Sequence, residues 1–253
     1  MPDQAERATR LKPPPVRQKR LALFLDLDGV LAPLAPTPEA VGPVARRTAV
    51  LTALDVRLEG RLAILSGRTL DEIDRIADGA VRSASGVHGL ERRSGDDEPV
   101  RAEASPRVRE AVEAFEAFAE GRPGIIVEDK GVAAGLHYRQ SPESRDEAAA
   151  LAERLADETG LKLQPGHMVL ELKTPGADKG KALASFMTEA PFKGAVPVMV
   201  GDDLTDEYGF EAATALGGFG VLVGPDRTTA ARYRLDDVDA VLTWLEAIAE
   251  TPE

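Results

Sequence analysis

The stretch Leu21-Ala-Leu-Phe-Leu-Asp26-Leu-Asp28-Gly29-Val30-Leu31 decides the fold, because a short apolar run in it delivers two carboxylates into a glycine turn. The run predicts a buried strand, and the chain already turns at its carboxyl end, so Asp26 and Asp28 can reach one pocket. Paired aspartates at such an edge suit Mg²⁺, which prefers oxygen ligands, and a carboxylate can also take up a phosphoryl group. The same pattern is typical of an ordinary turn and helix cap, so other segments must decide between the two interpretations.

Two further segments offer groups for a phosphate. The apolar run 62–65 ends in Ser66-Gly67-Arg68, ahead of a helix predicted over 69–79, and the first N–H groups of a helix favour anions. Taken alone, Ser66 is more typical of an ordinary N-cap. Lys179 stands at the start of a helix predicted over 178–190, and its compact charge suits both a phosphate and a nucleophilic aspartate.

A fourth apolar run, 196–200, leads through Gly201 into an acidic cluster of Asp202, Asp203 and Asp206. This is more acid than a helix cap requires, and the cluster would repel itself without a cation. In chain order, the four segments therefore present an acid pair, a hydroxyl, a lysine and an acid cluster.

That ordered set resembles the haloacid dehalogenase (HAD) superfamily of phosphatases, and within it the wording is similar to that of the trehalose 6-phosphate phosphatase family. The likeness runs over about residues 21–225 and lies in DLDGVL, ILSGR, GVHGLE (86–91), VEDKG (127–131), HYR (137–139), LELK followed by DKGKAL, and GDDLTDE. One position departs from the pattern, because Val30 stands where that family commonly has Thr. The change leaves the acids untouched.

The resemblance implies hydrolysis of trehalose 6-phosphate to trehalose and phosphate in two steps. Asp26 would attack phosphorus and form an aspartyl phosphate. Asp28 would protonate the departing sugar oxygen and then activate the water that hydrolyses the intermediate. Ser66 and Lys179 would bind the transferring oxygens.

The resemblance also implies a Mg²⁺ cofactor. Its ligands would be Asp26, the backbone carbonyl of Asp28, and Asp202. Asp203 and Asp206 would support this site, either by holding metal-bound water or by orienting the lysine, and the sequence leaves these two roles open.

Several residues are implied as substrate contacts by the same likeness. They are Ser66, Gly67, Arg68, His88, Gly89, Glu128, Lys130, Arg139 and Glu171. Carboxylates and an ammonium make good partners for sugar hydroxyls. On their own, Glu128, Lys130 and Glu171 are more typical of an exposed ion-pair ladder on a sheet face, and only the resemblance favours the sugar contacts.

Strands and helices alternate over 20–93 and 176–253, which predicts an α/β fold with a Rossmann-like, mainly parallel sheet and a site at its carboxyl edge. The expected strands lie near 21–27, 61–66, 83–87, 196–201 and 219–223. The expected helices lie near 38–58, 69–79, 178–190, 203–215 and 236–250.

Residues 94–175 interrupt this alternation and predict a separate α+β cap inserted between the second and third motifs. Helices are expected over 106–120 and 142–159, and strands over 124–129, 132–140, 161–164 and 168–173, the last pair joined by a hairpin at Pro165-Gly166. Both hairpins can form one antiparallel sheet over the site. This order also resembles the C2B-type cap of the sugar-phosphatase branch. The loop 94–99 is expected to be the first hinge or a surface turn.

Composition excludes several classes of protein. The formal charge of −12 argues against nucleic-acid binding, which needs a basic face. The absence of cysteine removes disulfides and cysteine nucleophiles, and no apolar stretch approaches the ~20 residues of a membrane span. The basic start lacks the apolar run of a signal peptide, so residues 1–19 are interpreted as a mobile arm and the protein as cytoplasmic.

Rival functions stay open at this stage. A phosphatase or mutase for another sugar phosphate, such as sucrose phosphate or mannosylglycerate phosphate, would share core and cap. A non-catalytic partner of a trehalose 6-phosphate synthase is less favoured because every acid of the motifs is present. Functional pairing of an active enzyme with such a synthase is a further possibility.

Overall fold

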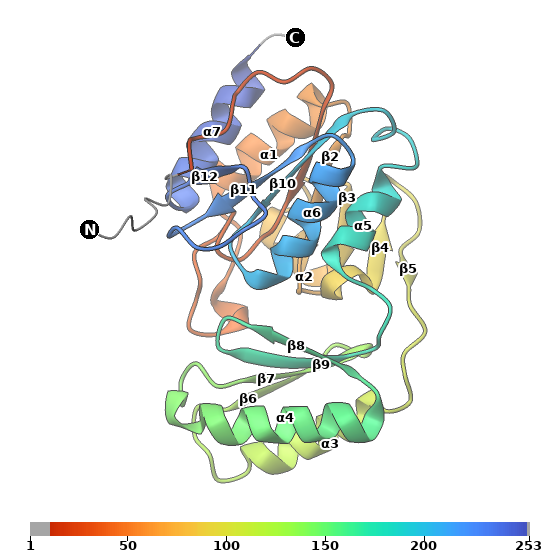
Figure 1. Cartoon of the computed structure of the whole chain (residues 1–253), viewed down its shortest axis with the longest axis vertical. Helices are drawn as coiled ribbons and strands as arrows, with labels where there is room; N and C mark the ends of the chain where they lie inside the picture. The colour runs from red at the N-terminus through yellow and green to blue at the C-terminus, as the bar shows by residue number, and fades with distance from the viewer. Residues whose placement is uncertain (1–10, 252–253) are drawn as a thin grey trace, which may run out of the picture.

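Two β-sheets organise the chain in the computed structural model, which describes residues 11–251 (Figure 1). The larger sheet has the order β12-β11-β10-β1-β2-β3-β4-β5, in which neighbours from β12 to β3 are parallel and β4 and β5 add antiparallel strands. Its strands are β1 (Leu21–Leu25), β2 (Leu62–Leu65), β3 (Ser83–Gly86), β4 (Glu91–Arg93), β5 (Val100–Arg101), β10 (Val196–Gly201), β11 (Phe219–Val223) and β12 (Tyr233–Leu235). The α/β class with a mainly parallel sheet is confirmed.

Helices cover both faces of this sheet, as the alternation of β1 requires. Leu23 and Leu25 pack with α1 (Ala45–Arg57), α2 (Leu70–Ala77) and α7 (Val238–Glu250). Phe24 points the other way, into a cluster with α5 (Lys179–Phe186) and α6 (Glu207–Ala215). Both faces are apolar because a strand between two helix layers buries successive side chains in opposite directions. The buried strands hold the polar residues at their carboxyl ends in place.

The smaller sheet is antiparallel with the order β6-β7-β9-β8. Its strands are β6 (Ile126–Asp129), β7 (Ala133–His137), β8 (Lys162–Gly166) and β9 (Val169–Lys173). One face packs on α3 (Val108–Ala119) and α4 (Arg145–Thr159), where Phe115, Leu136 and Leu172 are buried. The opposite face is turned toward the larger sheet (Figure 1).

Two predicted boundaries are wrong. The helix expected over 38–58 is divided, with a 3₁₀ turn at Pro38–Ala40 and α1 starting only at Ala45, because Pro43 disfavours a helical residue before it. The second hairpin does not turn at Pro165-Gly166, which belong to β8; the turn lies at residues 167–168. Proline is tolerated there because β8 is an edge strand of the smaller sheet.

The structures of two further segments differ from the expectation. β5 pairs with β4 in the larger sheet, so the chain leaves that sheet after residue 101 rather than at 94, and the loop 94–99 is the turn between these strands. Residues 12–16 of the expected mobile arm make defined contacts: Lys12 bridges to Tyr233, and Trp244 donates a hydrogen bond to the Pro15 carbonyl. The start of the arm, residues 1–10, lies outside the described residues.

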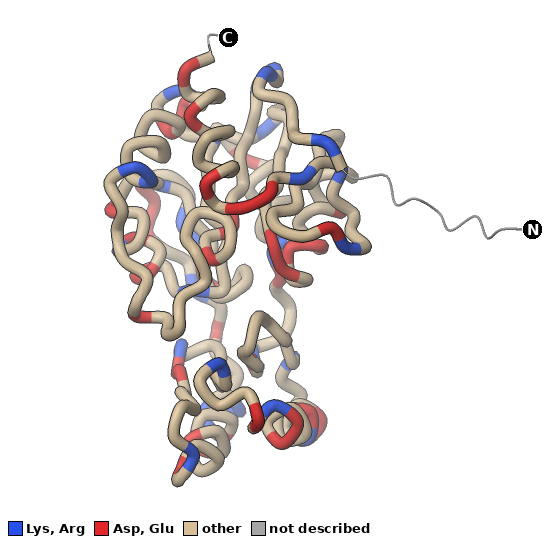
Figure 2. The backbone as a smooth tube through the Cα atoms, turned by 90° about the vertical axis from the view of Figure 1, so that its left-hand side faces the viewer, with Lys and Arg blue, Asp and Glu red and all other residues tan. Residues whose placement is uncertain are grey.

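Acidic and basic residues are spread over the whole described chain, including both the part with the larger sheet and the part with the smaller sheet (Figure 2). The acidic side chains of the site described below are therefore a small part of the total. Between residues 11 and 251, no helix has the length and apolar composition needed to cross a membrane.

Candidate active site

A cleft of about 160 Å³ lies where the carboxyl ends of β1, β2 and β10 face the smaller sheet. Every residue that the sequence assigned to the site lines it, except Gly89 and Asp206. Gly89 has a backbone role, since φ is +101° and a Cβ there would lie 3.0 Å from the Asp178 carbonyl oxygen. Asp206 lies directly behind the cleft wall, fully buried. The fold therefore gathers residues from both sheets at one place.

Asp26 is the centre of the charged groups in the cleft. Its Oδ1 accepts a hydrogen bond from the Leu27 amide at 2.7 Å, and its Oδ2 lies 2.8 Å from Lys179 Nζ. Burial raises the pKa of Asp26 well above its usual range, although Lys179 opposes the rise. Burial alone would lower the pKa of Lys179, but Asp206 and Asp26 hold it above the ordinary lysine value. The lysine therefore stays charged beside a carboxylate that needs a cation.

Asp206 organises the acidic loop rather than facing the cleft. Its Oδ1 accepts from Lys179 Nζ at 2.6 Å, and its Oδ2 accepts from the amides of Asp202 and Asp203 at 2.9 and 3.0 Å. Both oxygens are thus engaged. Asp203 instead caps the turn that follows, where its Oδ1 accepts from the Leu204 amide at 2.6 Å. This geometry favours the lysine-orienting role for Asp206, which the sequence left open.

The residues present fit a divalent metal. Carboxylate oxygens of Asp26, Asp202 and Asp206 lie within 4.8 Å of one another. Burial and the neighbouring Asp206 raise the pKa of Asp202 to about 7, so a bound cation would favour the anionic form of Asp202. Gly29 allows this approach, because a Cβ there would lie 2.0 Å from Asp202 Oδ2. Asp26 and Asp202 are the better ligands, since both line the cleft, whereas Asp206 is fully buried behind it.

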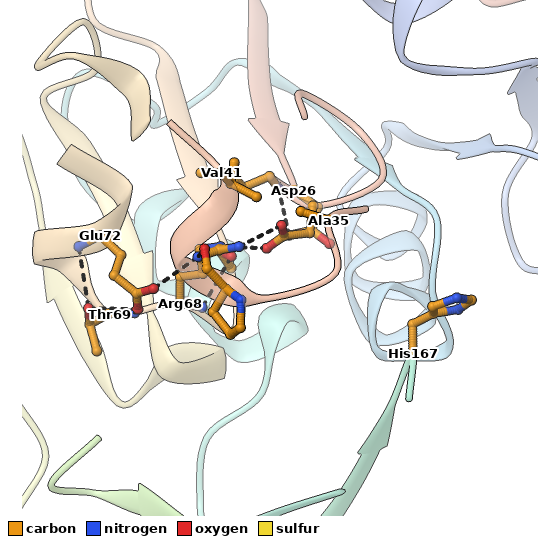
Figure 3. A network of polar contacts seen from close by, with 12 residues as sticks. Asp26, Ala35, Val41, Arg68, Thr69, Glu72 and His167 are labelled. Carbon is orange, nitrogen blue, oxygen red and sulfur yellow. Dashed lines mark hydrogen bonds and ion pairs between the residues drawn. The ribbon is translucent and has the colours of Figure 1, made fainter. Parts of the chain in front are cut away.

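Asp28 is held by Arg68 in a two-pronged ion pair. Arg68 Nε donates to Asp28 Oδ2 at 2.7 Å, and Nη2 donates to Oδ1 at 2.9 Å. The same guanidinium donates to Glu72 Oε1 and to the Pro38 carbonyl, both at 2.9 Å. Figure 3 shows Arg68 between Glu72, with its Thr69 cap, and the turn after β1. An ionised Asp28 in this pairing accepts hydrogen bonds and has no proton to donate.

The face of the smaller sheet above Asp26 carries a polar row across all four strands. Glu128, Gly135, Glu171 and Gln164 are successive register partners on β6, β7, β9 and β8. The glycine has no side chain, and Glu128 and His137 lie within 3.6 Å of the place where its Cβ would stand. Lys130 spans the row, since its Nζ lies 2.7 Å from Glu171 Oε2 and 3.6 Å from Glu128 Oε2. Glu128 is two residues from Lys130 in the chain, whereas Glu171 comes from β9, so the register of the sheet brings the second carboxylate to the lysine.

The two sheets also touch at the cleft. Lys130 Nζ donates to the Gly67 carbonyl at 2.8 Å, and Arg139 donates to the carbonyls of Ala35 and His167. His167 stands apart from the Arg68 network, at the tip of the β8–β9 hairpin (Figure 3). Lys130 and Arg139 therefore hold the smaller sheet closed over the site.

Two buried polar atoms in the cleft lack partners among the described residues, His88 Nδ1 and Glu171 Oε1. Burial, together with ammonium groups led by Lys179, lowers the pKa of His88 well below its usual value, so its ring is neutral. Its Nε2 lies 3.7 Å from Glu171 Oε1, too far for a hydrogen bond. Unsatisfied buried polar atoms are costly, and in a cleft they indicate a polar ligand.

Sequence reasoning missed His137, which lines the cleft and lies 2.9 Å from Glu128 Oε2 through Nε2. Alternation along β7 could have found it, because residues 135 and 137 share a face, and 135 is the register partner of Glu128. The loop at residues 34–38 and Glu72 also line the cleft and were missed. Their signal lies in tertiary contacts alone.

A parallel sheet with Asp26, Ser66, Lys179 and Asp202 at its carboxyl edge is the arrangement of a HAD-fold phosphatase. The family model described as trehalose-phosphatase matches residues 24–239. The chain belongs to that family.

Relatives and solved structures agree with this assignment. Trehalose-6-phosphate phosphatase of Escherichia coli (strain K12) is 40% identical over 237 residues, which are 92% of this chain and 88% of that protein. The probable trehalose-phosphate phosphatase of Sinorhizobium fredii is 37% identical over 206 residues, 81% of this chain and 78% of that protein. A solved trehalose-6-phosphate phosphatase related protein has 26% identity and a TM-score of 0.76, covering 90% of this chain and 96% of that one.

The fold is also that of the C-terminal domain of C. albicans trehalose-6-phosphate phosphatase. That structure has a TM-score of 0.81 at 22% identity and covers 92% of this chain and 93% of its own. At this identity the likeness concerns the fold alone.

Proposed function

We propose that this chain hydrolyses trehalose 6-phosphate to trehalose and inorganic phosphate, with Mg²⁺ as its cofactor. The observation that carries the proposal is the polar row of Glu128, Glu171 and Gln164 on the smaller sheet, which lines the same cleft as Asp26. A neutral disaccharide offers many hydroxyls to such a row, while its phosphate reaches the cationic Lys179. Membership in the trehalose-phosphatase family supports the same substrate.

The chemistry follows from the groups at the end of β1. An Asp26 oxygen attacks phosphorus, and the bond between phosphorus and the sugar oxygen breaks as Asp28 gives that oxygen a proton. Water then attacks phosphorus, Asp28 takes its proton, and the Asp26 carboxylate is restored as phosphate leaves. Ser66 and Lys179 hold the phosphoryl oxygens during both steps. Asp28 has to leave Arg68 and carry a proton before the first step.

Asp26 and Asp202, with the Asp28 carbonyl, are the proposed Mg²⁺ ligands. Bound there, the ion would offset the repulsion between the attacking carboxylate and the phosphate. The predicted cytoplasmic location and functional pairing with a synthase remain predictions from the sequence.

The proposed function is tested by phosphate release from a panel of sugar phosphates, with Mg²⁺ and with chelator. Trehalose 6-phosphate should be the best substrate, ahead of sucrose phosphate and mannosylglycerate phosphate, and chelator should abolish turnover. Full activity in chelator would contradict the metal requirement. Faster hydrolysis of another sugar phosphate would overturn the substrate and leave the phosphatase class standing.

Alanine at Glu128, Lys130 or Glu171 tests the sugar contacts separately. Each change should lower kcat/KM for trehalose 6-phosphate by at least about tenfold, because remote binding energy helps to align the phosphate. 4-Nitrophenyl phosphate cannot reach the row, so its slow hydrolysis should be unchanged. Equal losses on both substrates would mean that these residues support the fold or the chemistry. No loss on either would indicate an ion-pair ladder.

A further inference from the structure

Arg227 lies in the loop after β11 and contacts the backbone of the acidic loop from outside the cleft. Its Nη2 donates to the Asp203 carbonyl at 2.9 Å and lies 3.5 Å from the Asp202 carbonyl oxygen. Its Nη1 pairs with Glu207 at the start of α6. Arg227 is not among the residues that line the cleft. Arg227 therefore contacts the backbone that carries the site residues and is not placed to contact a ligand.

The backbone of Asp202 and Asp203 is held at both its N–H groups and its carbonyl groups. Asp206 Oδ2 accepts their N–H groups at 2.9 and 3.0 Å, while Arg227 faces their carbonyl oxygens. A carboxylate on one side and a guanidinium on the other make charge-assisted bonds, which are stronger and more directional than neutral ones. The backbone that carries the Asp202 side chain toward Asp26 is thus fixed in position.

Arg227 is itself anchored. Glu207, its partner, accepts hydrogen bonds from Thr229 Oγ1 at 2.8 Å and from the Ala230 amide at 2.7 Å. The loop that carries Arg227 is therefore tied to the first turn of α6, which follows the acidic loop directly. The side chain of Arg227 is only 24% exposed, so its geometry is well defined.

We propose that Arg227 is a positioning residue for the metal site, which holds Asp202 at metal-binding distance from Asp26. This inference rests on the proposed metal-dependent function. Charge alone would act in the opposite direction: loss of Arg227 leaves Glu207 as an additional anion near the site, and an additional anion attracts a divalent cation. Weaker metal binding by the variant would therefore show that Arg227 positions Asp202, and tighter binding would show that only its charge matters.

The test is Mn²⁺ binding to the full chain, followed by electron paramagnetic resonance, and the Mg²⁺ dependence of turnover. Arg227→Ala should bind Mn²⁺ about tenfold more weakly, while kcat at saturating Mg²⁺ stays within about twofold of wild type. Arg227→Lys keeps the charge but has a single donor nitrogen, so its Mn²⁺ affinity should lie between those of wild type and Arg227→Ala. Arg122→Ala is the matched control, because Arg122 also bonds a carbonyl and a carboxylate, but on the smaller sheet's α3 side. Its Mn²⁺ binding should be unchanged.

Unchanged or tighter Mn²⁺ binding by Arg227→Ala would overturn the inference, as would a lower kcat with unchanged metal affinity. A melting temperature measured in chelator shows whether the variants fold, and Arg227→Lys carries the test if Arg227→Ala does not. Failure of the proposed function would give a different result, because wild type would then bind Mn²⁺ but release no phosphate from trehalose 6-phosphate. If wild type binds no divalent cation, both proposals are wrong.

Discussion

Replacing Asp206 by asparagine exchanges one oxygen for an NH₂ group in a buried carboxylate whose two oxygens are both bonded. Asp206 is fully buried and accepts three hydrogen bonds, one from Lys179 and two from the amides of Asp202 and Asp203. Asparagine keeps one acceptor oxygen and gains a donor NH₂. Whichever way the amide turns, either the ammonium or both backbone N–H groups face another donor.

The expected cost follows from these contacts. A hydrogen bond to a charged group contributes about 1.5–3 kcal/mol, and breaking a buried ion pair costs about 3–5 kcal/mol. Lys179 keeps Asp26 as a second partner at 2.8 Å, and loss of the Asp206 charge relieves its repulsion of Asp26 and Asp202, so the loss should lie near the lower end, at about 3 kcal/mol. This is a large share of the ~5–15 kcal/mol that typically holds a domain folded.

Urea unfolding in chelator, followed by the fluorescence of Trp244, measures this loss. Trp244 is the one tryptophan of the chain and is buried in the larger sheet's core, so it reports the unit that contains Asp206. Asp203→Asn is the control, because asparagine and aspartate cap helices about equally well, and it should lose under about 0.5 kcal/mol. A loss below about 1 kcal/mol in Asp206→Asn would refute the claim that this carboxylate joins the lysine to the acidic loop.

Two further changes test the nucleophile and a buried lysine. Asp26→Asn should reduce phosphate release at least about a thousandfold without altering the circular dichroism spectrum, and a tenth of wild-type turnover would exclude an aspartyl phosphate. Lys173 is fully buried with the Ala177 carbonyl as its hydrogen-bond acceptor, and burial lowers its pKa to about 8. Between pH 8 and about 10.4 the unfolded chain therefore binds more protons than the folded chain. Burial of the charged Lys173 lowers the free energy of unfolding by its full amount below pH 8, and this loss shrinks as the pH rises above 8. Lys173→Met should thus raise the free energy of unfolding by about 3 kcal/mol at pH 7 and by far less at pH 10; an equal gain at both pH values would show that packing is the cause.

Local patterns in the sequence predicted the central strands because each is a short apolar run that ends in polar residues. The run 21–25 became β1, and 196–201 became β10, with Asp26 and Asp202 where the chain leaves each strand. The missed strands β4, β5 and β12 are two or three residues long; β5 and β12 are the edges of the larger sheet, and β4 is next to β5. Residues such as Arg92 and Arg101 carry no strand signal, because pairing with a neighbour, not burial, makes them strands.

Site roles divide in the same way. The likeness of the motifs to a known family was enough to select Asp26, Asp28, Ser66, Lys179 and Asp202, and all five line one cleft. Their bonding partners could not be predicted, since Arg68 reaches Asp28 across 40 residues and Arg227 reaches Asp203 across 24. Such pairings depend on where the strands end in space.

The sequence alone therefore determined which chemistry the chain carries, because periodicity and residue type are local properties, and the aspartates of the site follow two apolar runs. Only the tertiary structure decided how those groups are used. It paired Asp28 with Arg68, gave both oxygens of Asp206 to Lys179 and the acidic loop, and set the row from Glu128 to Gln164 over Asp26. The physical reason is that hydrogen bonds and pKa shifts depend on distances between residues far apart in the chain, which parallel crossovers and strand register alone bring together.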